Sequence, residues 1–234
     1  MRIRFKPYAR PELEAWPHFI NNALDLKGKW KEAYANPQLP FYLELGCGKG
    51  GFAAAVGCAN PNINFLGVDI KSEVLVVAKR AIDKAYEQNN LPLNNLLITS
   101  WNIENIGEML SAQDSVDRIY INFCNPCQKG GYAKHRLTHP RQLVKYRAFL
   151  KEGAPIYFKT DDDPLFEDSL RYFELSGFEV EWLSRNLHTD EPDWNVRTEH
   201  EKMFSDEGIP IKACIAYKKE VELDWDSLLL SKNI

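Results

Sequence analysis

Glu44-Leu-Gly-Cys-Gly-Lys-Gly-Gly51 is the stretch that decides the fold of this chain. An apolar run, Phe41-Tyr-Leu-Glu-Leu45, leads into these glycines, and residues 52–56 continue with the small and apolar side chains of a helix. Glycines between a strand and a helix permit a tight turn and let a ligand approach the backbone. The stretch therefore predicts a ligand site at the carboxyl end of a strand.

The same alternation of strand and helix continues through the rest of the chain. Residues 72–87 have apolar side chains at helical spacing, and Asp163-Pro164 is typical of a helix start with Asp163 as the cap; Gly177 is a candidate for the end of that helix. The pattern predicts a seven-stranded, mostly parallel sheet with helices on both faces. The strands are expected at 41–45, 64–69, 95–99, 116–123, 154–159, 178–182 and 211–217.

Composition limits the class of protein. The 234 residues include 29 Lys and Arg against 33 Asp and Glu, which gives a net charge of -4. This charge is ordinary for a globular chain. It argues against general affinity for nucleic acid but does not exclude a local basic face. No run approaches the ~18 apolar residues of a membrane-spanning helix. The charged N-terminus and five cysteines, an odd number, predict a cytoplasmic protein with free thiols.

We expect one domain over residues 1–234. It would consist of an N-terminal extension (1–40), a catalytic core (41–219) and a tail (220–234), because no linker-like segment divides the chain.

The glycines fit two ligand templates. Gly46, Gly48 and Gly51 match a dinucleotide fingerprint, whereas Gly46, Gly48 and Gly50 match an adenosylmethionine loop. The glycines alone do not decide between the two.

Asp69 at the end of the second strand can hold ribose hydroxyls in either ligand class. Polar residues at three other predicted strand ends favour S-adenosylmethionine. Glu44 would repel a pyrophosphate but suits the cationic methionine end. Asn102 is placed to contact the adenine. Asn125 follows the fourth strand, where such enzymes present a polar group to the atom that is methylated.

A specific family is suggested by motifs outside the glycine loop. From Arg2 to about Tyr217 the chain resembles the bacterial tRNA (guanine-N7)-methyltransferases. The matching motifs are Leu26-Lys-Gly-Lys-Trp30, Glu44-Leu-Gly-Cys-Gly-Lys-Gly50, Gly67-Val-Asp-Ile-Lys71, Arg118-Ile-Tyr-Ile-Asn-Phe123, Arg136-Leu-Thr-His-Pro-Arg141, Phe158-Lys-Thr-Asp161, Leu165-Phe-Glu-Asp-Ser-Leu170 and Thr198-Glu-His-Glu201.

The resemblance implies an α/β, Rossmann-like class I methyltransferase that uses S-adenosylmethionine. Its expected product is 7-methylguanosine at position 46, in the variable loop of tRNA. By the same resemblance Asn125 is the catalytic residue, the cofactor site contains Glu44, Asp69, Asn102 and Asn125 with the glycine loop, and the substrate site contains Lys129, Asp161, Thr198, Glu199, His200 and Glu201.

The chain departs from the family pattern Phe-x-Asp-Pro-Trp-Pro-Lys. Asn125 replaces the catalytic Asp, Cys127 replaces the Trp, and glycine or tyrosine replaces several basic residues that follow. Guanine N7 has a lone pair and no proton to lose, so transfer depends on proximity and orientation. Asn125 can accept a hydrogen bond through one oxygen but carries no charge. We therefore expect guanine to be held less tightly, with slower turnover.

Three alternatives stay open at this point. A catalytically weakened relative could bind RNA or a protein partner through the same fold. An enzyme acting on an exocyclic amine could use Asn125-Pro126 to orient an N–H group, and a third possibility is a smaller acceptor.

Metal binding is not expected. Cys124, Cys127, His135 and His139 form a possible zinc set, but the gap between Cys127 and His135 is short for a finger. In the acidic run 161–163, we expect Asp161 to face the cleft, Asp162 to be exposed and Asp163 to cap the helix.

A basic stretch follows the predicted active-site loop. Residues 123–151 contain no Asp or Glu. With the basic N-terminal arm, this stretch predicts a tRNA-binding face that acts through phosphate contacts; whether the protein is a monomer or a homodimer is left open. The cations are Arg2, Arg4, Lys6, Arg10, Lys129, Lys134, Arg136, Arg141, Lys145, Arg147 and Lys151.

Overall fold

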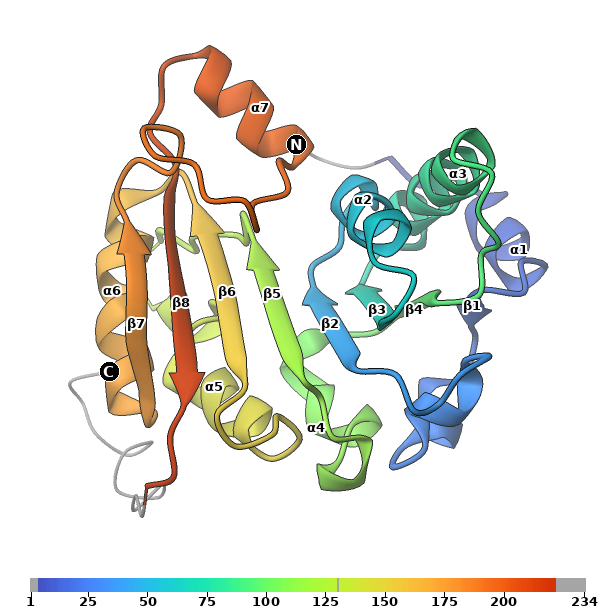
Figure 1. Ribbon diagram of the computed structural model, residues 1–234, viewed down its shortest axis with the longest axis horizontal. Coiled ribbons are helices and arrows are strands. Elements are labelled where there is room, and N and C mark those ends of the chain that lie inside the picture. Colours follow the sequence, from blue (N-terminus) through green and yellow to red (C-terminus); the bar gives the residue numbers. More distant parts are fainter. Residues whose placement is uncertain (1–3, 130, 222–234) are drawn as a thin grey trace.

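The computed structural model describes residues 4–129 and 131–221, and its strands form one mixed sheet (Figure 1). The strand order is β1-β4-β3-β2-β5-β6-β8-β7, parallel throughout except that β8 runs antiparallel to both of its neighbours. The strands are β1 (Phe19–Ile20), β2 (Phe41–Leu45), β3 (Asn64–Asp69), β4 (Leu96–Ser100), β5 (Arg118–Asn122), β6 (Pro155–Thr160), β7 (Phe178–Ser184) and β8 (Lys212–Lys218). The predicted α/β class is confirmed.

The sheet has eight strands, so the prediction of seven was wrong by one. The additional strand, β1, comes from the N-terminal extension and pairs in parallel with β4 at the edge of the sheet, with Phe19 opposite Ile98. Two residues are too few to give a period-2 pattern, so local sequence contains no signal for this strand. The predicted N-terminal cation Arg2 and residues 222–234 of the predicted tail lie outside the described residues.

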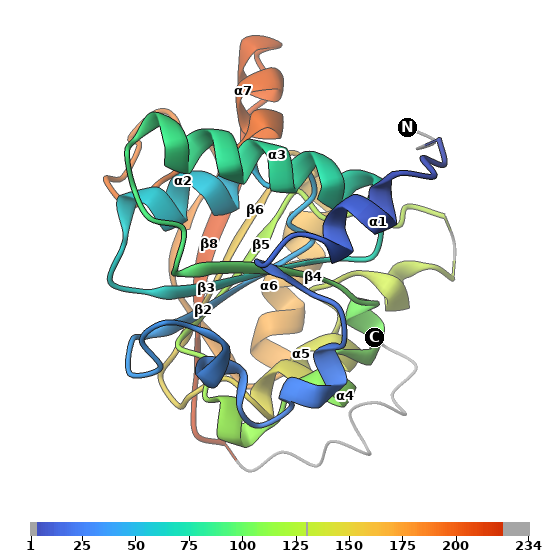
Figure 2. The same ribbon diagram turned by 90° about the vertical axis from the view of Figure 1, so that its right-hand side faces the viewer.

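Helices cover both faces of the sheet (Figure 2). One face carries α1 to α3, and the other carries α4 to α6. The helices are α1 (Ala9–Glu14), α2 (Gly51–Ala59), α3 (Ser72–Gln88), α4 (Ile106–Met109), α5 (Pro140–Arg147), α6 (Asp163–Leu175) and α7 (Glu199–Asp206), with short 3-10 helices at Ala23–Leu26, Trp30–Ala33, Ile103–Asn105, Ala112–Asp114 and Ala133–His135.

Two apolar cores result, one on each face. Neighbouring residues of β3 point to opposite sides, so that Phe65 packs with α1 to α3 and Leu66 packs in the other core. Both faces of these strands are therefore buried, as expected for parallel strands between helices.

The N-terminal extension is anchored by Trp30, which is fully buried. The indole Nε1 donates to the carbonyl of Met109 at 2.8 Å, and the Asp114 carboxylate accepts from the backbone N–H groups of Trp30 and Gly28. Gly28 has φ +80°, a conformation that favours glycine. These contacts explain the Gly and Trp of the motif at residues 26–30.

The start of α6 differs from the prediction by one residue. Asp162 is the cap, because its side chain accepts a hydrogen bond from the N–H of Leu165 at 2.7 Å, and Asp163 is already the first helical residue. Asp162 is half-buried rather than exposed. Gly177 follows the end of the helix with φ +71°, as its expected role requires.

The direction of chain progression reverses between β2 and β5. From β2 the chain moves outward through β3 and β4, and then crosses back to β5 on the other side of β2. In open α/β sheets, ligands bind beyond the carboxyl ends of the strands at such a switch point. The glycine loop after β2 lies at this position.

Candidate active site

A cavity of about 490 Å³ opens at the switch point. Its walls come from the glycine loop, the ends of β3, β4 and β5, and the N-terminus of α7. The structure brings ten of the predicted site residues together in this wall: Glu44, Gly46, Gly48, Gly50, Asp69, Asn102, Asn125, Thr198, Glu199 and His200.

The backbone of the glycine loop separates the two ligand templates. Gly46, Gly48 and Gly50 have φ values of +83°, +52° and +75°, whereas Gly51 is simply the first residue of α2. A Cβ on Gly50 would lie 2.7 Å from the Cβ of Ala78. The three positions that need glycine are therefore those of the adenosylmethionine template.

Glu44 is buried in the wall of the cavity with half of its carboxylate unpaired. Its Oε1 accepts from Asn122 Nδ2 at 3.1 Å, while Oε2 and the Asn122 Oδ1 have no partner among the described residues. Burial raises the pKa of Glu44 to about 8. Two buried acceptors without partners, on residues that line the same cavity, suit a cationic group that donates several hydrogen bonds.

Asp69 and Asn102 border the same cavity. The Asp69 carboxylate accepts from the N–H groups of Gly48 and Lys71, both at 3.1 Å, which fixes its direction at the end of β3. Asn102 caps the short helix that follows β4, with its Oδ1 accepting from Glu104 N at 3.0 Å. Backbone N–H groups thus hold each side chain, which retains further hydrogen-bonding capacity.

Asn125 is held in a turn just after β5. Its Oδ1 accepts from the N–H of Cys127 at 2.9 Å, which is an Asx-turn. Phe123 and Cys127 have φ values of +51° and +48°, which is uncommon for residues other than glycine. The guanidinium of Arg136 donates to the Pro126 carbonyl at 2.7 Å and ties this turn to the segment before α5.

Three predicted substrate residues do not line the cavity. Lys129 is exposed, and Asp161 is half-buried beyond β6 with its carbonyl accepting from Lys212. Glu201 is completely buried. Its carboxylate contacts other side chains of the protein and does not reach the cavity, although the sequence predicts it in the substrate site.

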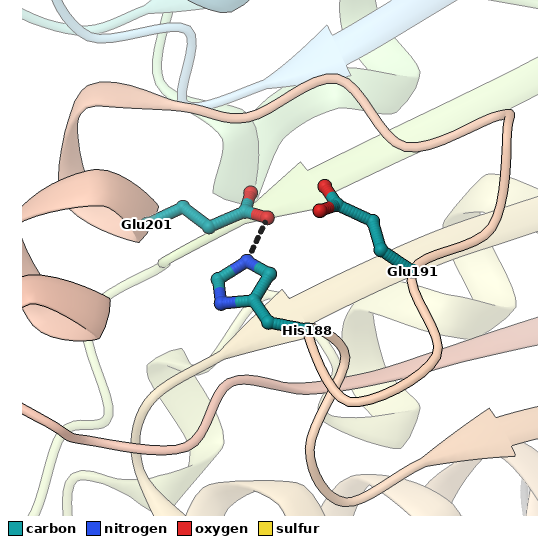
Figure 3. Close-up of side chains that lie close together, drawn as sticks. All are labelled: His188, Glu191 and Glu201. Atoms are coloured by element: carbon teal, nitrogen blue, oxygen red, sulfur yellow. Dashed lines mark hydrogen bonds and ion pairs between the residues drawn. The ribbon is translucent and has the colours of Figure 1, made fainter.

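Glu201 is the centre of a network that fastens α7. Lys159 on β6 lies 2.7 Å from Glu201 Oε2, and Nζ also donates to Asn195 Oδ1 and the Val196 carbonyl, both at 2.9 Å. His188 Nε2 lies 2.9 Å from Glu201 Oε1 (Figure 3). Thr198 and Glu201 also form the predicted capping box. Burial raises the pKa of Glu201, but the Lys159 charge and these hydrogen bonds outweigh burial, so its pKa is lowered.

Sequence reasoning missed Lys159. The only signal is a lysine within the apolar run of β6, whose other strand residues are largely buried. A lysine in such a position needs a buried partner. That partner lies 42 positions further along the chain, and no local pattern points to it.

Comparison with known proteins shows the family of this chain. A family described as "Putative methyltransferase" matches residues 38–214. A tRNA (guanine-N(7)-)-methyltransferase of Clostridium perfringens (strain SM101 / Type A) is 54% identical over 218 residues, which cover 93% of this chain and 100% of that protein. One from Acetivibrio thermocellus is 46% identical over 94% of this chain and 100% of its own length. The chain belongs to the tRNA (guanine-N(7)-)-methyltransferase family.

Solved structures place this methyltransferase in the Rossmann-like class I fold. The 16S rRNA methyltransferase KamB has a TM-score of 0.55 at 14% identity, over 77% of this chain and 88% of its own. A 16S rRNA (adenine(1408)-N(1))-methyltransferase variant from Catenulisporales acidiphilia has a TM-score of 0.53 at 16% identity, over 86% and 95%. These similarities confirm the predicted fold class.

Potential metal ligands in this methyltransferase gather at His188, Glu191 and Glu201, whose ligand atoms lie within 4.8 Å of one another. Both carboxylates already have cationic partners, since Lys159 pairs with Glu201 and Arg197 pairs with Glu191. Such pairing favours a structural role for the cluster. The four residues of the possible zinc set do not form a group of this kind in the part of the chain described here.

An aromatic surface and an ion pair close one end of the cavity. The rings of Phe123 and His200 stack at 6.0 Å between centroids, and Phe204 packs against both. Lys49 of the glycine loop lies 3.2 Å from Glu199 of α7. These contacts join β2, β5 and α7 around one opening, although they are far apart in sequence (Figure 1).

The predicted basic face is smaller than the sequence suggested. Six of its cations make internal contacts. In the N-terminal arm, Lys6 donates to the Glu73 carbonyl and Arg10 pairs with Glu14. In the basic run, Arg136–Asp168 and Lys151–Asp117 are ion pairs at 2.5 Å. Lys145 donates to the Glu104 carbonyl, and Arg147 donates to the carbonyls of Gly177 and Lys219. In the basic run 129–151, the exposed cations without an ion pair to a described residue are Lys129, Lys134 and Arg141.

No helix within residues 4–129 and 131–221 is long and apolar enough to span a membrane.

Proposed function

We propose that this enzyme transfers the methyl group of S-adenosylmethionine to N7 of a guanine in the variable loop of tRNA, at position 46. The proposal is carried by the 54% identity to a tRNA (guanine-N(7)-)-methyltransferase over the full length of that relative. The cavity at the switch point supplies matching chemistry.

The residues of the cavity fit the cofactor. S-adenosylmethionine supplies an activated methyl group on a sulfonium. Glu44 and Asn122 would hold its ammonium group, because both present buried acceptors without partners. Asp69 would accept from the ribose hydroxyls and Asn102 would contact the adenine, with Gly46, Gly48 and Gly50 leaving room for the ligand along the backbone.

The protein needs no general base for this reaction. N7 carries a lone pair in neutral guanine, so the task of the site is to hold N7 in line with the methyl–sulfur bond. Asn125 is fixed at the cavity wall by its own turn and is the candidate for this positioning.

On the substrate side, we propose that Lys129, Asp161, Thr198, Glu199 and His200 contact the tRNA. Glu201 would act indirectly, by holding the start of α7 through Lys159. The exposed cations Arg4, Lys71, Lys134 and Arg141 would add contacts to phosphates. The cytoplasmic location stays a prediction.

Of the alternatives, methylation of an exocyclic amine has less support. That chemistry requires an acceptor for the amine N–H, and one of the two lone pairs of the Asn125 Oδ1 is already engaged by the Cys127 N–H. Nothing within residues 4–129 and 131–221 specifically favours a relative that binds RNA or a protein partner without catalysis.

The test is incubation of the protein with labelled S-adenosylmethionine and tRNA that lacks the modification, followed by nucleoside analysis. We expect label in 7-methylguanosine, and loss of that label when the target guanine is replaced in the tRNA. Glu44→Gln should weaken cofactor binding while the fold, measured by circular dichroism, is kept. Label in another nucleoside, or cofactor binding without transfer to tRNA, would contradict the proposal.

A further inference from the structure

We propose that Asn125 donates a hydrogen bond from its amide Nδ2 to O6 of the target guanine, and that this bond selects guanine over adenine. The inference rests on the proposed function and names the atom through which the enzyme reads its base. It reverses the role expected from sequence, in which the Asn125 oxygen would accept from the base.

The hydrogen bond to Cys127 assigns the two ends of the Asn125 amide. A backbone N–H can only donate, so the atom 2.9 Å from Cys127 N must be the oxygen. That interaction leaves the Nδ2 group, which has two protons and no partner among the described residues, as the free end. Asn125 is exposed and borders the cavity, so this free end is available to a ligand.

The surrounding structure holds the turn that contains Asn125 in a strained conformation. Phe123 and Cys127, two residues to either side, both adopt positive φ, a conformation that costs free energy for residues other than glycine. The Pro126 carbonyl between them is held by Arg136, which is itself buried and paired with Asp168. Strain that the surroundings maintain at a cavity wall is typical of a functional position.

The chemistry of the two purines matches a donor at this place. Guanine presents two acceptors side by side, N7 and O6, whereas adenine presents N7 beside an N6 amine that donates. A donor on O6 leaves the N7 lone pair free for the methyl group. The same donor would face the N6 amine of adenine, and two opposed donors in a partly enclosed site cost binding free energy.

The neighbouring aromatic surface supports this orientation. His200 and Phe123 stack next to Asn125 and line the same cavity. A purine lying against the exposed part of this surface would present its edge to the turn at residue 125.

The experiment measures kcat/KM on tRNAs that carry guanine, 2-aminopurine or adenine at the target position, with the wild-type enzyme and Asn125→Asp. 2-Aminopurine lacks O6 but keeps N7. The aspartate can still accept from Cys127 N, so the turn is kept, while a negatively charged acceptor replaces the donor. Circular dichroism and cofactor binding check that the variant is folded.

For the wild type we expect a loss of about tenfold or more when O6 is removed. In Asn125→Asp this loss should fall to below threefold, and discrimination against adenine should decrease, because a carboxylate can accept from the N6 amine. If Asn125→Asp is inactive on every base, Asn125→Ala removes the donor without adding a charge, although it also removes the acceptor of the Cys127 N–H, so its fold and cofactor binding are checked in the same way.

Two results would overturn the inference while leaving the proposed function intact. One is a wild type that forms 7-methylguanosine and tolerates the loss of O6 within threefold. The other is an O6 dependence of the same size in the wild type and in the variant. Absence of 7-methylguanosine from the guanine tRNA would instead refute the proposed function itself, and the inference with it.

Discussion

The buried pair between Lys159 and Glu201 offers the sharpest test of how the substrate side of the cavity is held. The two side chains are 4% and 0% exposed, and Glu201 is the buried residue of α7. Figures 1 and 2 show α7 standing away from the rest of the fold, beyond the carboxyl ends of β5 and β6. Lys159→Met therefore removes a buried attachment of α7 and leaves a carboxylate buried without its cation.

Removing one member of a buried ion pair costs about 3–5 kcal/mol. Glu201 keeps the N–H of Thr198, the amide of Asn195 and His188 as partners, so we expect a value near ~3 kcal/mol, the lower end of that range. The loss should fall on α7 and the loop before it, because the apolar cores around the sheet do not depend on Lys159.

Hydrogen exchange of the amides in α7 measures this local loss directly. A change of ~3 kcal/mol corresponds to a fall in protection by about 100-fold. The kcat/KM on tRNA should decrease with it, since Thr198, Glu199 and His200 would leave the cavity wall. Lys49→Met, which breaks the exposed pair with Glu199, is the matched control, and we expect it to change protection by less than threefold.

The double variant Lys159→Met/Glu201→Gln separates an unpaired charge from lost packing. Glutamine keeps an acceptor for the Thr198 N–H but needs no cation, so most of the protection should return. The reasoning is refuted if Lys159→Met leaves α7 as protected as in the wild type, or if the double variant is less protected than the single one.

The other predictions concern pH, salt and the glycine loop. Burial raises the pKa of Glu44 to about 8, so the ligand-free protein favours the protonated side chain. The stability that this protonated form contributes is complete below about pH 4.5 and is lost as the pH rises to 8, by up to ~1.4 kcal/mol per pH unit. The Tm of the wild type should therefore fall over this range, and the Tm of Glu44→Gln should fall less. Binding of S-adenosylmethionine at pH 7 should release close to one proton, which calorimetry in buffers of different ionisation enthalpy detects; no buffer dependence would contradict this role of Glu44. Arg141→Gln should make the plot of log tRNA affinity against log salt concentration less steep, by the amount expected for about one phosphate contact. Lys151→Gln removes a cation that is already paired with Asp117, so it should leave that slope unchanged. Gly50→Ala should lower the free energy of unfolding by more than ~2 kcal/mol, because the added methyl group collides with Ala78 of α3. Gly153 also has a positive φ but lies in open space, so Gly153→Ala should lower the free energy of unfolding by only about 1 kcal/mol in the same denaturation assay.

Elements that depend on neighbours in sequence were predictable. The strand from residue 64 to 69 and the helix from Ser72 agree with the structure to within one residue. The capping box of Thr198 and Glu201 was also predictable, because both partners lie within one helical turn. The cap of α6 was misplaced by one residue because three consecutive aspartates offer equivalent side chains, and only the backbone geometry shows that Asp162 is used.

Properties that depend on distant partners were not predictable. The basic run after β5 predicts one charged face, but Arg136, Arg147 and Lys151 bind partners 30 to 72 positions away in the chain. In the same way β1 exists only because β4 offers an edge, and two residues without that edge have no reason to be extended.

The sequence by itself determined the alternation of strands and helices, the glycine loop and the polar residues at the strand ends, because spacing and residue type set these features locally. Only the tertiary structure decided that Glu44 faces the cavity with an unpaired oxygen, that Glu201 is bound to Lys159, and that the Asn125 oxygen is already engaged. The physical reason is that a side chain's chemistry follows from which of its atoms remain unpaired, and most of those pairings join residues far apart in the chain.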